Sequence, residues 1–348
     1  KSENGNYGLV TNIKVPFYFE QHNNNNRRMT HNTACIFKQF GVLVALSTPE
    51  DSFNAYSIAD GFFFKHIFSF RQKYSSLASI SAADDNTLIL LSQDGTINVW
   101  CFLKKAGSIS GIMSSGITAG GSSSVNNATS NNNNNANGNG TSINGENGID
   151  FGISNSVDKC PADFEFNYNG KDFSIIQKFR RNHHFVTTKD AFGNGNLGLI
   201  ASCDINKRII LTDLNNGSFL RSWFINGKSL SPQSVMILDS GFIAALCETG
   251  SQNAKRTVIQ CFTIDAEIAG AYDHFGVAIS WIPLNYRNGT SFIAVSYEDC
   301  TLLVLHVPDL KVMTEIKFPS IITRIYFNKE NNCLILSNSQ GKILTTNL

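Results

Sequence analysis

A short apolar run that ends in a small polar residue recurs six times along this 348-residue chain. Turn-forming residues follow each of the six runs, which are Leu43–Ser47, Leu88–Ser92, Leu199–Ser202, Ile243–Cys247, Ile293–Ser296 and Leu334–Ser337. The steps between their last residues are 45, 110, 45, 49 and 41 residues. A period of about 40 to 50 residues made of short strands is typical of folds in which each repeat forms one small sheet.

One copy of the repeat can be assigned strand by strand. Leu77–Ser81 is a predicted inner strand, and Asp84–Asn86 is a predicted turn because Asp and Asn hydrogen-bond to their own backbone and tolerate positive φ. Thr87–Leu91 is nearly all apolar, which suits a strand buried on both faces. Asp94 and Gly95 favour a tight hairpin, and Thr96–Trp100 then alternates as a third strand.

Two copies carry residues of a known repeat. Ser92–Trp100 resembles the end of a WD repeat, with Trp100 at the tryptophan position and Cys101 where aspartate would follow. A later copy departs from the motif at the other position: it keeps the aspartate, Asp213, but has Thr212 at the tryptophan position. The resemblance implies an all-β fold, a degenerate WD40-like β-propeller of six to seven four-stranded blades.

No copy shows the Gly-His pair of regular WD repeats. We therefore expect that the buried Asp-His-Ser-Trp hydrogen-bond relay of those repeats is not assembled in this chain. Blade packing then rests mainly on apolar burial, at about 25 cal/mol per Å². A seventh blade would come from Val15–Glu20, from Phe164–Phe179 or from residues outside this sequence.

A second resemblance covers roughly the last 150 residues. Its segments, Phe262–Ile268, Trp281, Gly289–Ser296 and Ile322–Phe327, are similar to the C-terminal propeller of BEACH-domain proteins, the beige and neurobeachin group, especially the protist forms. The resemblance implies that PH-like and BEACH domains lie upstream of Lys1. It also implies a role as a cytosolic scaffold in membrane and vesicle traffic.

The step of 110 residues contains a low-complexity segment. Residues 107–155 consist mostly of Ser, Gly and Asn, including the run Asn131–Asn135. Such a segment cannot bury enough apolar area to offset the entropy cost of ordering. We therefore predict a disordered insertion at 107–155 between two parts of one propeller, residues 1–106 and 156–348.

Composition limits the partners. With 28 Lys and Arg against 27 Asp and Glu, the chain lacks the basic footprint of a nucleic-acid-binding protein. It has no run of 18 apolar residues, so we expect no transmembrane segment. Its eight cysteines include no Cys-x-x-Cys pair, so we expect no zinc or other cofactor and a reducing, cytoplasmic setting. Peripheral association with membranes and the oligomeric state stay open.

No pattern of catalytic residues is found, so we expect no enzyme. The seven histidines are scattered except for His183 and His184, whose side chains would point in opposite directions on a strand. Ser92–Thr96 faintly resembles the Asp box of sialidase propellers, and a glycan hydrolase would need a channel lined by arginines and acids. Our leading hypothesis is a non-catalytic scaffold that binds other proteins through its rim loops and top face.

A basic segment supplies the other alternative. Phe179, Arg180 and Arg181 match three residues of the Phe-Arg-Arg-Gly signature of PROPPINs, the phosphoinositide-binding propellers, although Asn182 replaces the glycine. In this alternative Lys178, Arg180 and Arg181 bind lipid headgroups, because guanidinium groups suit phosphate and each basic charge near a membrane contributes about 1 kcal/mol. The ordinary interpretation is an exposed basic stretch before a strand.

Overall fold

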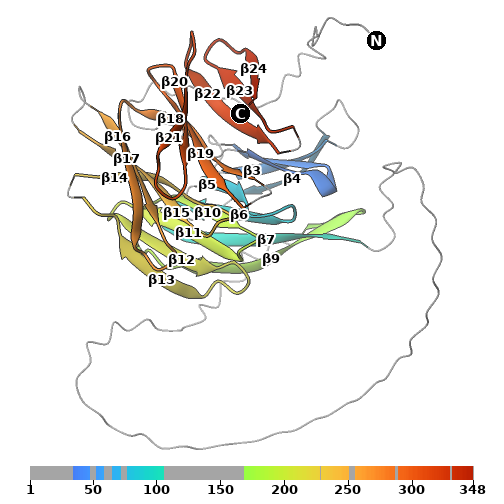
Figure 1. Cartoon of the computed structure of the whole chain (residues 1–348). Coiled ribbons are helices and arrows are strands. Elements are labelled where there is room, and N and C mark those ends of the chain that lie inside the picture. Colours follow the sequence, from blue (N-terminus) through green and yellow to red (C-terminus); the bar gives the residue numbers. More distant parts are fainter. Residues whose placement is uncertain are drawn as a thin grey trace, which may run out of the picture. The chain divides into compact units, whose positions relative to one another are not determined.

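The computed structural model describes residues 34–47, 52–58, 65–71, 77–105, 168–227, 229–250, 255–286, 289–329 and 331–347. These residues all belong to one compact unit, which combines the chain before residue 107 with the chain from residue 165 onward. The predicted insertion and Val15–Glu20 lie outside the described residues. The described part contains 24 strands and one short 3-10 helix, η1 (Lys38–Phe40) (Figure 1).

The strands form six antiparallel sheets. The first three sheets contain, in spatial order, β1 (Ala34–Phe37), β2 (Val42–Ser47), β3 (Ser52–Ser57) and β4 (Lys65–Arg71); β5 (Leu77–Ala82), β6 (Thr87–Ser92), β7 (Thr96–Lys104), β9 (Phe173–Asn182) and β8 (Tyr168–Asn169); β10 (Thr188–Asn194), β11 (Leu199–Asp204), β12 (Arg208–Asp213) and β13 (Phe219–Phe224).

The last three sheets follow in the same manner. They contain β14 (Ser231–Ile237), β15 (Ile243–Thr249), β16 (Arg256–Phe262) and β17 (Ile268–Phe275); β18 (Ala278–Asn285), β19 (Ser291–Tyr297), β20 (Thr301–His306) and β21 (Val312–Lys317); β22 (Ile322–Asn328), β23 (Cys333–Asn338) and β24 (Ile343–Asn347).

These six sheets are the blades of a β-propeller, which confirms the predicted fold class. Each of the six recurrent apolar runs lies on the second strand of a blade, on β2, β6, β11, β15, β19 and β23. The strands predicted around Thr87–Leu91 are also confirmed. Four blades have four strands, the second has five, and the sixth has three among the described residues.

One prediction about a seventh blade is wrong. The described part of Phe164–Phe179 forms β8 and most of β9, and these strands extend the second blade. β9 pairs with β7 along its length, with Thr96 opposite Asn182 at one end and Lys104 opposite Phe173 at the other. The segment therefore returns after the insertion as the fourth strand of the sheet that precedes the insertion.

The second strands of the second to fifth blades are buried on both faces because each packs against the blades on both sides. In β6, Leu88 and Leu90 belong to the apolar cluster shared with the first blade, whereas Ile89 and Leu91 belong to the cluster shared with the third. Successive side chains of a strand point to opposite faces, so one unbroken apolar run supplies two interfaces. Five such clusters join the six blades pairwise in chain order.

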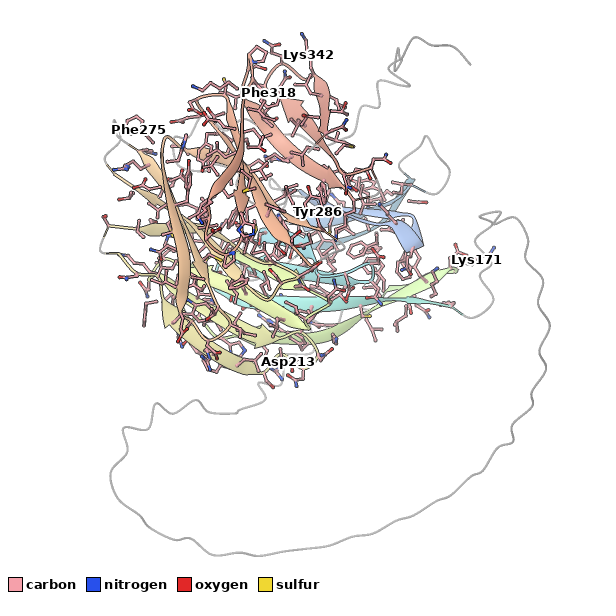
Figure 2. All side chains as sticks on the ribbon, in the orientation of Figure 1. Lys171, Asp213, Phe275, Tyr286, Phe318 and Lys342 are labelled. Carbon is pink, nitrogen blue, oxygen red and sulfur yellow. The ribbon has the colours of Figure 1, made fainter. Side chains whose placement is uncertain are left out.

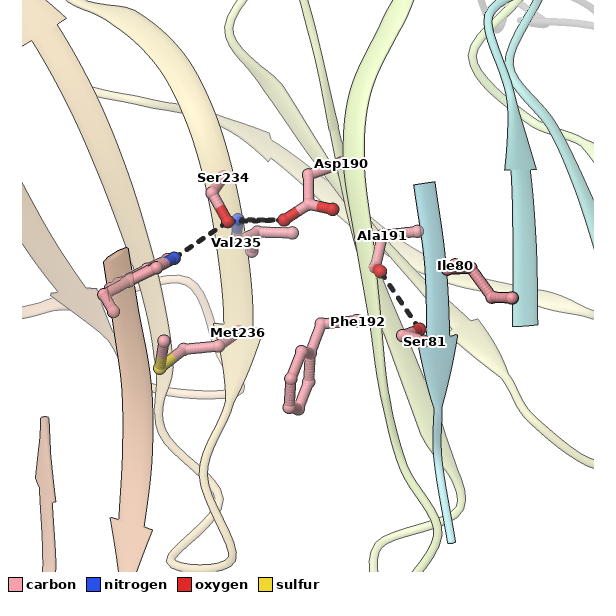
Figure 3. Close-up of a pocket in the computed structure, with 9 residues that line it drawn as sticks. Ile80, Ser81, Asp190, Ala191, Phe192, Ser234, Val235 and Met236 are labelled. Carbon is pink, nitrogen blue, oxygen red and sulfur yellow. Dashed lines mark hydrogen bonds between the residues drawn. The ribbon is translucent and has the colours of Figure 1, made fainter. Parts of the chain in front are cut away.

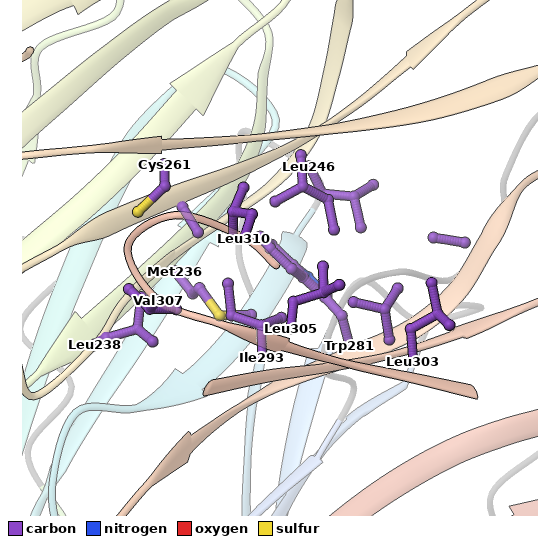
Figure 4. Packing of buried hydrophobic residues seen from close by; sticks show 14 of the residues in the cluster. Met236, Leu238, Leu246, Cys261, Trp281, Ile293, Leu303, Leu305, Val307 and Leu310 are labelled. Atoms are coloured by element: carbon purple, nitrogen blue, oxygen red, sulfur yellow. The ribbon is translucent and has the colours of Figure 1, made fainter. Parts of the chain in front are cut away.

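The cluster between the fourth and fifth blades shows the type of side chain that fills these interfaces (Figure 4). It brings Met236 and Leu246 of the fourth blade against Trp281, Ile293 and Leu305 of the fifth. These side chains are almost entirely shielded from solvent. Burial of this apolar surface is the main contribution to the packing of one blade on the next.

The cysteines in the described residues are all free. Burial raises the pKa of the Cys247 and Cys261 thiols to about 12 each and raises the pKa of Cys203 well above its usual value. These thiols stay protonated at neutral pH and pack as small apolar groups. In the part of the chain that the structure describes, no helix has the length and apolar character needed to cross a membrane.

The fourth and fifth blades approach so closely that one outer-strand position requires glycine. A Cβ atom on Gly270 of β17 would clash with the carbonyl oxygen of Pro308 and lie 3.0 Å from the carbonyl carbon of Asp309, both in the β20–β21 turn. We expect Gly270→Ala to lower the free energy of unfolding by about 1 to 3 kcal/mol, measured by urea denaturation. Gly241→Ala is the control, because a Cβ there meets no atom within 4 Å and only its φ of 86° opposes alanine. An equal or larger loss for Gly241→Ala would contradict the prediction.

Candidate functional site

A small cavity lies between the inner strands of the second to fifth blades (Figure 3). Its lining residues come from β5, β10, β14 and β18 and are Ile80, Ser81, Asp190, Ala191, Phe192, Ser234, Val235, Met236 and Trp281. Its volume of about 20 Å³ is enough for one water molecule. Pockets for small-molecule ligands are typically about 300 to 1,000 Å³, so this cavity does not accommodate a sugar or a nucleotide.

A chain of hydrogen bonds beside this cavity connects three blades (Figure 3). The indole Nε1 of Trp281 on β18 donates to Ser234 Oγ on β14 over 2.9 Å, and Ser234 Oγ donates to the carboxylate of Asp190 on β10. The backbone nitrogen of Val235 also donates to Asp190 Oδ2, over 3.3 Å. Ser234 and Asp190 are buried. Each polar group is thus satisfied by a neighbouring blade, which keeps the inner strands in register.

The lining of the cavity differs from the channel that a glycan hydrolase would need. Among the nine lining residues, Asp190 is the carboxylate and none is arginine. Asp190 is held by Ser234 and Val235 rather than directed at open space. The geometry of this cavity therefore supplies no argument for the glycan hydrolase alternative.

A second polar constellation is buried in the third blade and corrects a prediction. His184 Nδ1 lies 2.8 Å from Asp204 Oδ2, and His184 Nε2 lies 2.7 Å from Ser202 Oγ. These are three of the four residue types of the WD-repeat relay, so the expectation is wrong for the Asp, His and Ser members in this blade, whereas the tryptophan member is missing. Thr212 replaces the tryptophan, and its buried Oγ1 has no hydrogen-bond partner among the residues that the structure describes.

The structure also explains why the histidine was missed. His183 and His184 lie in the segment between β9 and β10, not on a strand, so their side chains need not point in opposite directions. His184 follows another histidine instead of the usual glycine. The available signal was Ser202, which ends the third apolar run, with Asp204 two residues later. These residues supply two of the four relay residue types at the end of a second strand.

The arrangement of Ser202, His184 and Asp204 has the residue types of a hydrolase triad. All three residues are at most 4% exposed, however, and Ser202 Oγ is directed at the imidazole from within a strand. In the described structure that hydroxyl is shielded from solvent and occupied by its bond to the imidazole. The constellation instead attaches the segment before β10 to the end of β11.

The predicted lipid-binding residues lie on a strand, not before one. Lys178, Arg180 and Arg181 belong to β9, which lies against the third blade. Lys178 Nζ donates to Asn215 Oδ1 over 3.2 Å, and Arg181 Nη1 donates to the carbonyl oxygen of Arg180 over 3.0 Å. Lys178 and Arg181 therefore interact with neutral acceptors, and lipid binding by these residues stays a prediction.

His183 lies at the end of this basic strand. Its Nε2 donates to the carbonyl oxygen of Gly217 over 3.0 Å, and its ring lies 5.9 Å from the ring of Phe219. Burial lowers the pKa of His183, and nearby Arg181 and Arg208 lower it further, while the bond to Gly217 acts in the opposite direction. His183 is therefore neutral at pH 7, and the positive charge beside it comes from the two arginines.

Comparisons with known proteins give no family for this chain. A scan against protein-family models finds no match, and a search of the curated proteins finds no relative. In the described ranges, no three His, Cys, Asp or Glu side chains are grouped so as to hold a metal ion.

The chain through Ser234 can be tested by removing one hydroxyl. Ser234→Ala leaves both the buried Trp281 Nε1 and the Asp190 carboxylate without this partner, so we expect the free energy of unfolding to fall by about 1 to 3 kcal/mol in chemical denaturation. Ser218→Ala, in an exposed turn, should change it by less than about 0.5 kcal/mol. Equal effects of the two substitutions would show that the chain contributes nothing to stability.

Proposed function

We propose that this WD40-like propeller is a non-catalytic scaffold that binds other proteins. Its buried polar groups, the relay of His184 and the chain through Ser234, hold neighbouring segments together and have no access to substrate. Partner proteins would then be bound by the surface, where rigid sheets position loops and strand ends.

The observation that carries this proposal is the set of large apolar side chains exposed at strand ends and loops. Phe185, Phe224, Phe275 and Ile343 each expose more than 60% of their surface. Phe275, labelled in Figure 2, ends the outer strand of the fourth blade. Aromatic residues are enriched where proteins bind one another and often dominate the binding energy.

Affinity purification of the tagged chain from its native cells tests the proposal. We expect proteins that co-purify in stoichiometric amounts and that bind the purified chain again in isothermal titration calorimetry. The same tag on an unrelated propeller is the control. Absence of any protein that rebinds, together with turnover of a small-molecule substrate by the purified chain, would overturn the proposal.

The proposal has a finer part, that the chain is the propeller of a BEACH-type protein of membrane and vesicle traffic. Its support is the sequence resemblance of Phe262–Ile268, Gly289–Ser296 and Ile322–Phe327. These segments contribute to strands of the fourth, fifth and sixth blades.

Sequencing the complete transcript tests this part. We expect the open reading frame upstream of Lys1 to encode PH-like and BEACH domains. An open reading frame without a BEACH domain would contradict the BEACH assignment and leave the protein-binding proposal standing.

A further inference from the structure

Positive charge is concentrated in one part of a nearly neutral chain. Residues 171–228, which span β9 and the third blade, contain nine Lys and Arg but four Asp and Glu. Two of the four acids, Asp190 and Asp204, are buried and hydrogen-bonded to Ser234 and His184. The surface of this region is therefore more basic than the composition of the whole chain indicates.

Three segments lie side by side at one edge of the third blade. The backbone nitrogen of Ile205 donates to the carbonyl oxygen of Thr187, and that of Ile225 donates to the carbonyl oxygen of Lys207. We call the residues 183–187, 204–208 and 224–227 the third-blade edge. Each segment presents one exposed apolar side chain; these are Phe185 (82% exposed), Ile205 (48%) and Phe224 (67%).

The loop that carries Phe185 is held from several sides. Asn182 Oδ1 accepts hydrogen bonds from the backbone nitrogens of His184 and Phe185, and Asn182 Nδ2 donates to the carbonyl oxygen of Asp94. His184 is fixed in turn by Asp204 and Ser202.

Phe185 itself has a φ of 56°, in the left-handed region that disfavours a bulky residue. A strained backbone that holds an aromatic ring in solvent is a feature of functional sites, because surrounding structure has to maintain it.

Two cations, Lys207 and Arg208, belong to the third-blade edge. Arg208 Nη2 donates to Ser222 Oγ over 3.1 Å, and Lys207 Nζ donates to the carbonyl oxygen of Gly227 over 3.0 Å. Arg181 and His183 lie against the same residue, because a Cβ atom on Gly217 would be 2.8 Å from Arg181 Cγ and the carbonyl oxygen of Gly217 accepts a hydrogen bond from His183 Nε2. The carboxylate of Asp94 is exposed in the adjacent β6–β7 turn. The guanidinium groups of Arg208 and Arg181 suit paired hydrogen bonds to individual carboxylates.

We propose that the third-blade edge binds an acidic peptide segment of a partner protein, with Phe185 packed against a large apolar side chain of that peptide and Arg181 and Arg208 facing its carboxylates. The inference rests on the proposed function and specifies the chemistry of the partner. A preformed edge of this kind binds without the cost of ordering its own loop.

Selection from a phage-displayed library of short random peptides on the purified chain tests the proposal. We expect enrichment of peptides that combine Asp or Glu with Phe, Trp or Leu. The enriched peptides, synthesised with a fluorescein label, should bind with a Kd that rises with salt concentration in fluorescence anisotropy. Enrichment without acidic residues would overturn the proposal.

Variants locate the binding surface. We expect Phe185→Asn to raise the Kd by at least about tenfold without lowering the melting temperature, because asparagine tolerates a left-handed backbone. Arg181→Gln with Arg208→Gln should raise the Kd and weaken its salt dependence. Tyr326→Asn is the matched control, since Tyr326 is an aromatic residue 53% exposed on β22 of the sixth blade and should leave the Kd unchanged. Equal Kd values for the parent chain and Phe185→Asn would overturn the proposal.

A membrane is the competing ligand for a basic edge with exposed apolar residues. Flotation with phosphatidylcholine vesicles that carry phosphatidylserine or a phosphatidylinositol phosphate should show no binding that depends on Phe185 and Arg181. Flotation that these two residues control would overturn the peptide proposal. Partners that still co-purify with Phe185→Asn would place protein binding elsewhere on the propeller and leave the proposed function intact.

Discussion

Burial of the second strand on both faces, which the second to fifth blades show, is the constraint on which the rest of the structure depends. An apolar run such as Ile243–Cys247 sends Ala244 and Leu246 toward the fifth blade and its alternate residues toward the third. A sheet with two apolar faces cannot exist alone in water, so each of these four blades needs neighbours on both sides. The chain must therefore repeat the unit, and the pairwise clusters along the sequence are the result.

Polar groups are stable inside this apolar structure only when they form hydrogen bonds between segments. Trp281, Ser234 and Asp190 come from three successive blades, and the Ser234 hydroxyl accepts a hydrogen bond from Trp281 and donates one to Asp190. His184, Asp204 and Ser202 do the same between a connecting segment and a strand end. Both constellations contain residue types that serve catalysis elsewhere, and burial decides that here they maintain geometry.

The same local geometry connects the core to the surface that we propose for binding. The buried imidazole of His184 fixes the backbone immediately before Phe185, and Asn182 holds the two backbone nitrogens of that turn. These hydrogen bonds stabilise the left-handed backbone conformation of Phe185, which is unfavourable for a bulky residue. An exposed aromatic ring on a rigid support loses little entropy on binding, which is what distinguishes it from a ring on a mobile loop.

The sequence by itself determined the strands, the hairpins and the number of recurrent units, because strand alternation and turn chemistry are local properties readable from neighbouring residues. The spacings of 44 and 47 residues that connect Asp190, Ser234 and Trp281 match the repeat and could have been found in the same way. Only the tertiary structure decided that β9 completes the second blade, that His184 reaches Asp204, and that Arg181 and His183 lie against the same turn residue, Gly217. These contacts depend on the path of connecting segments and on how one blade faces the next, and neither follows from the periodicity of a single strand.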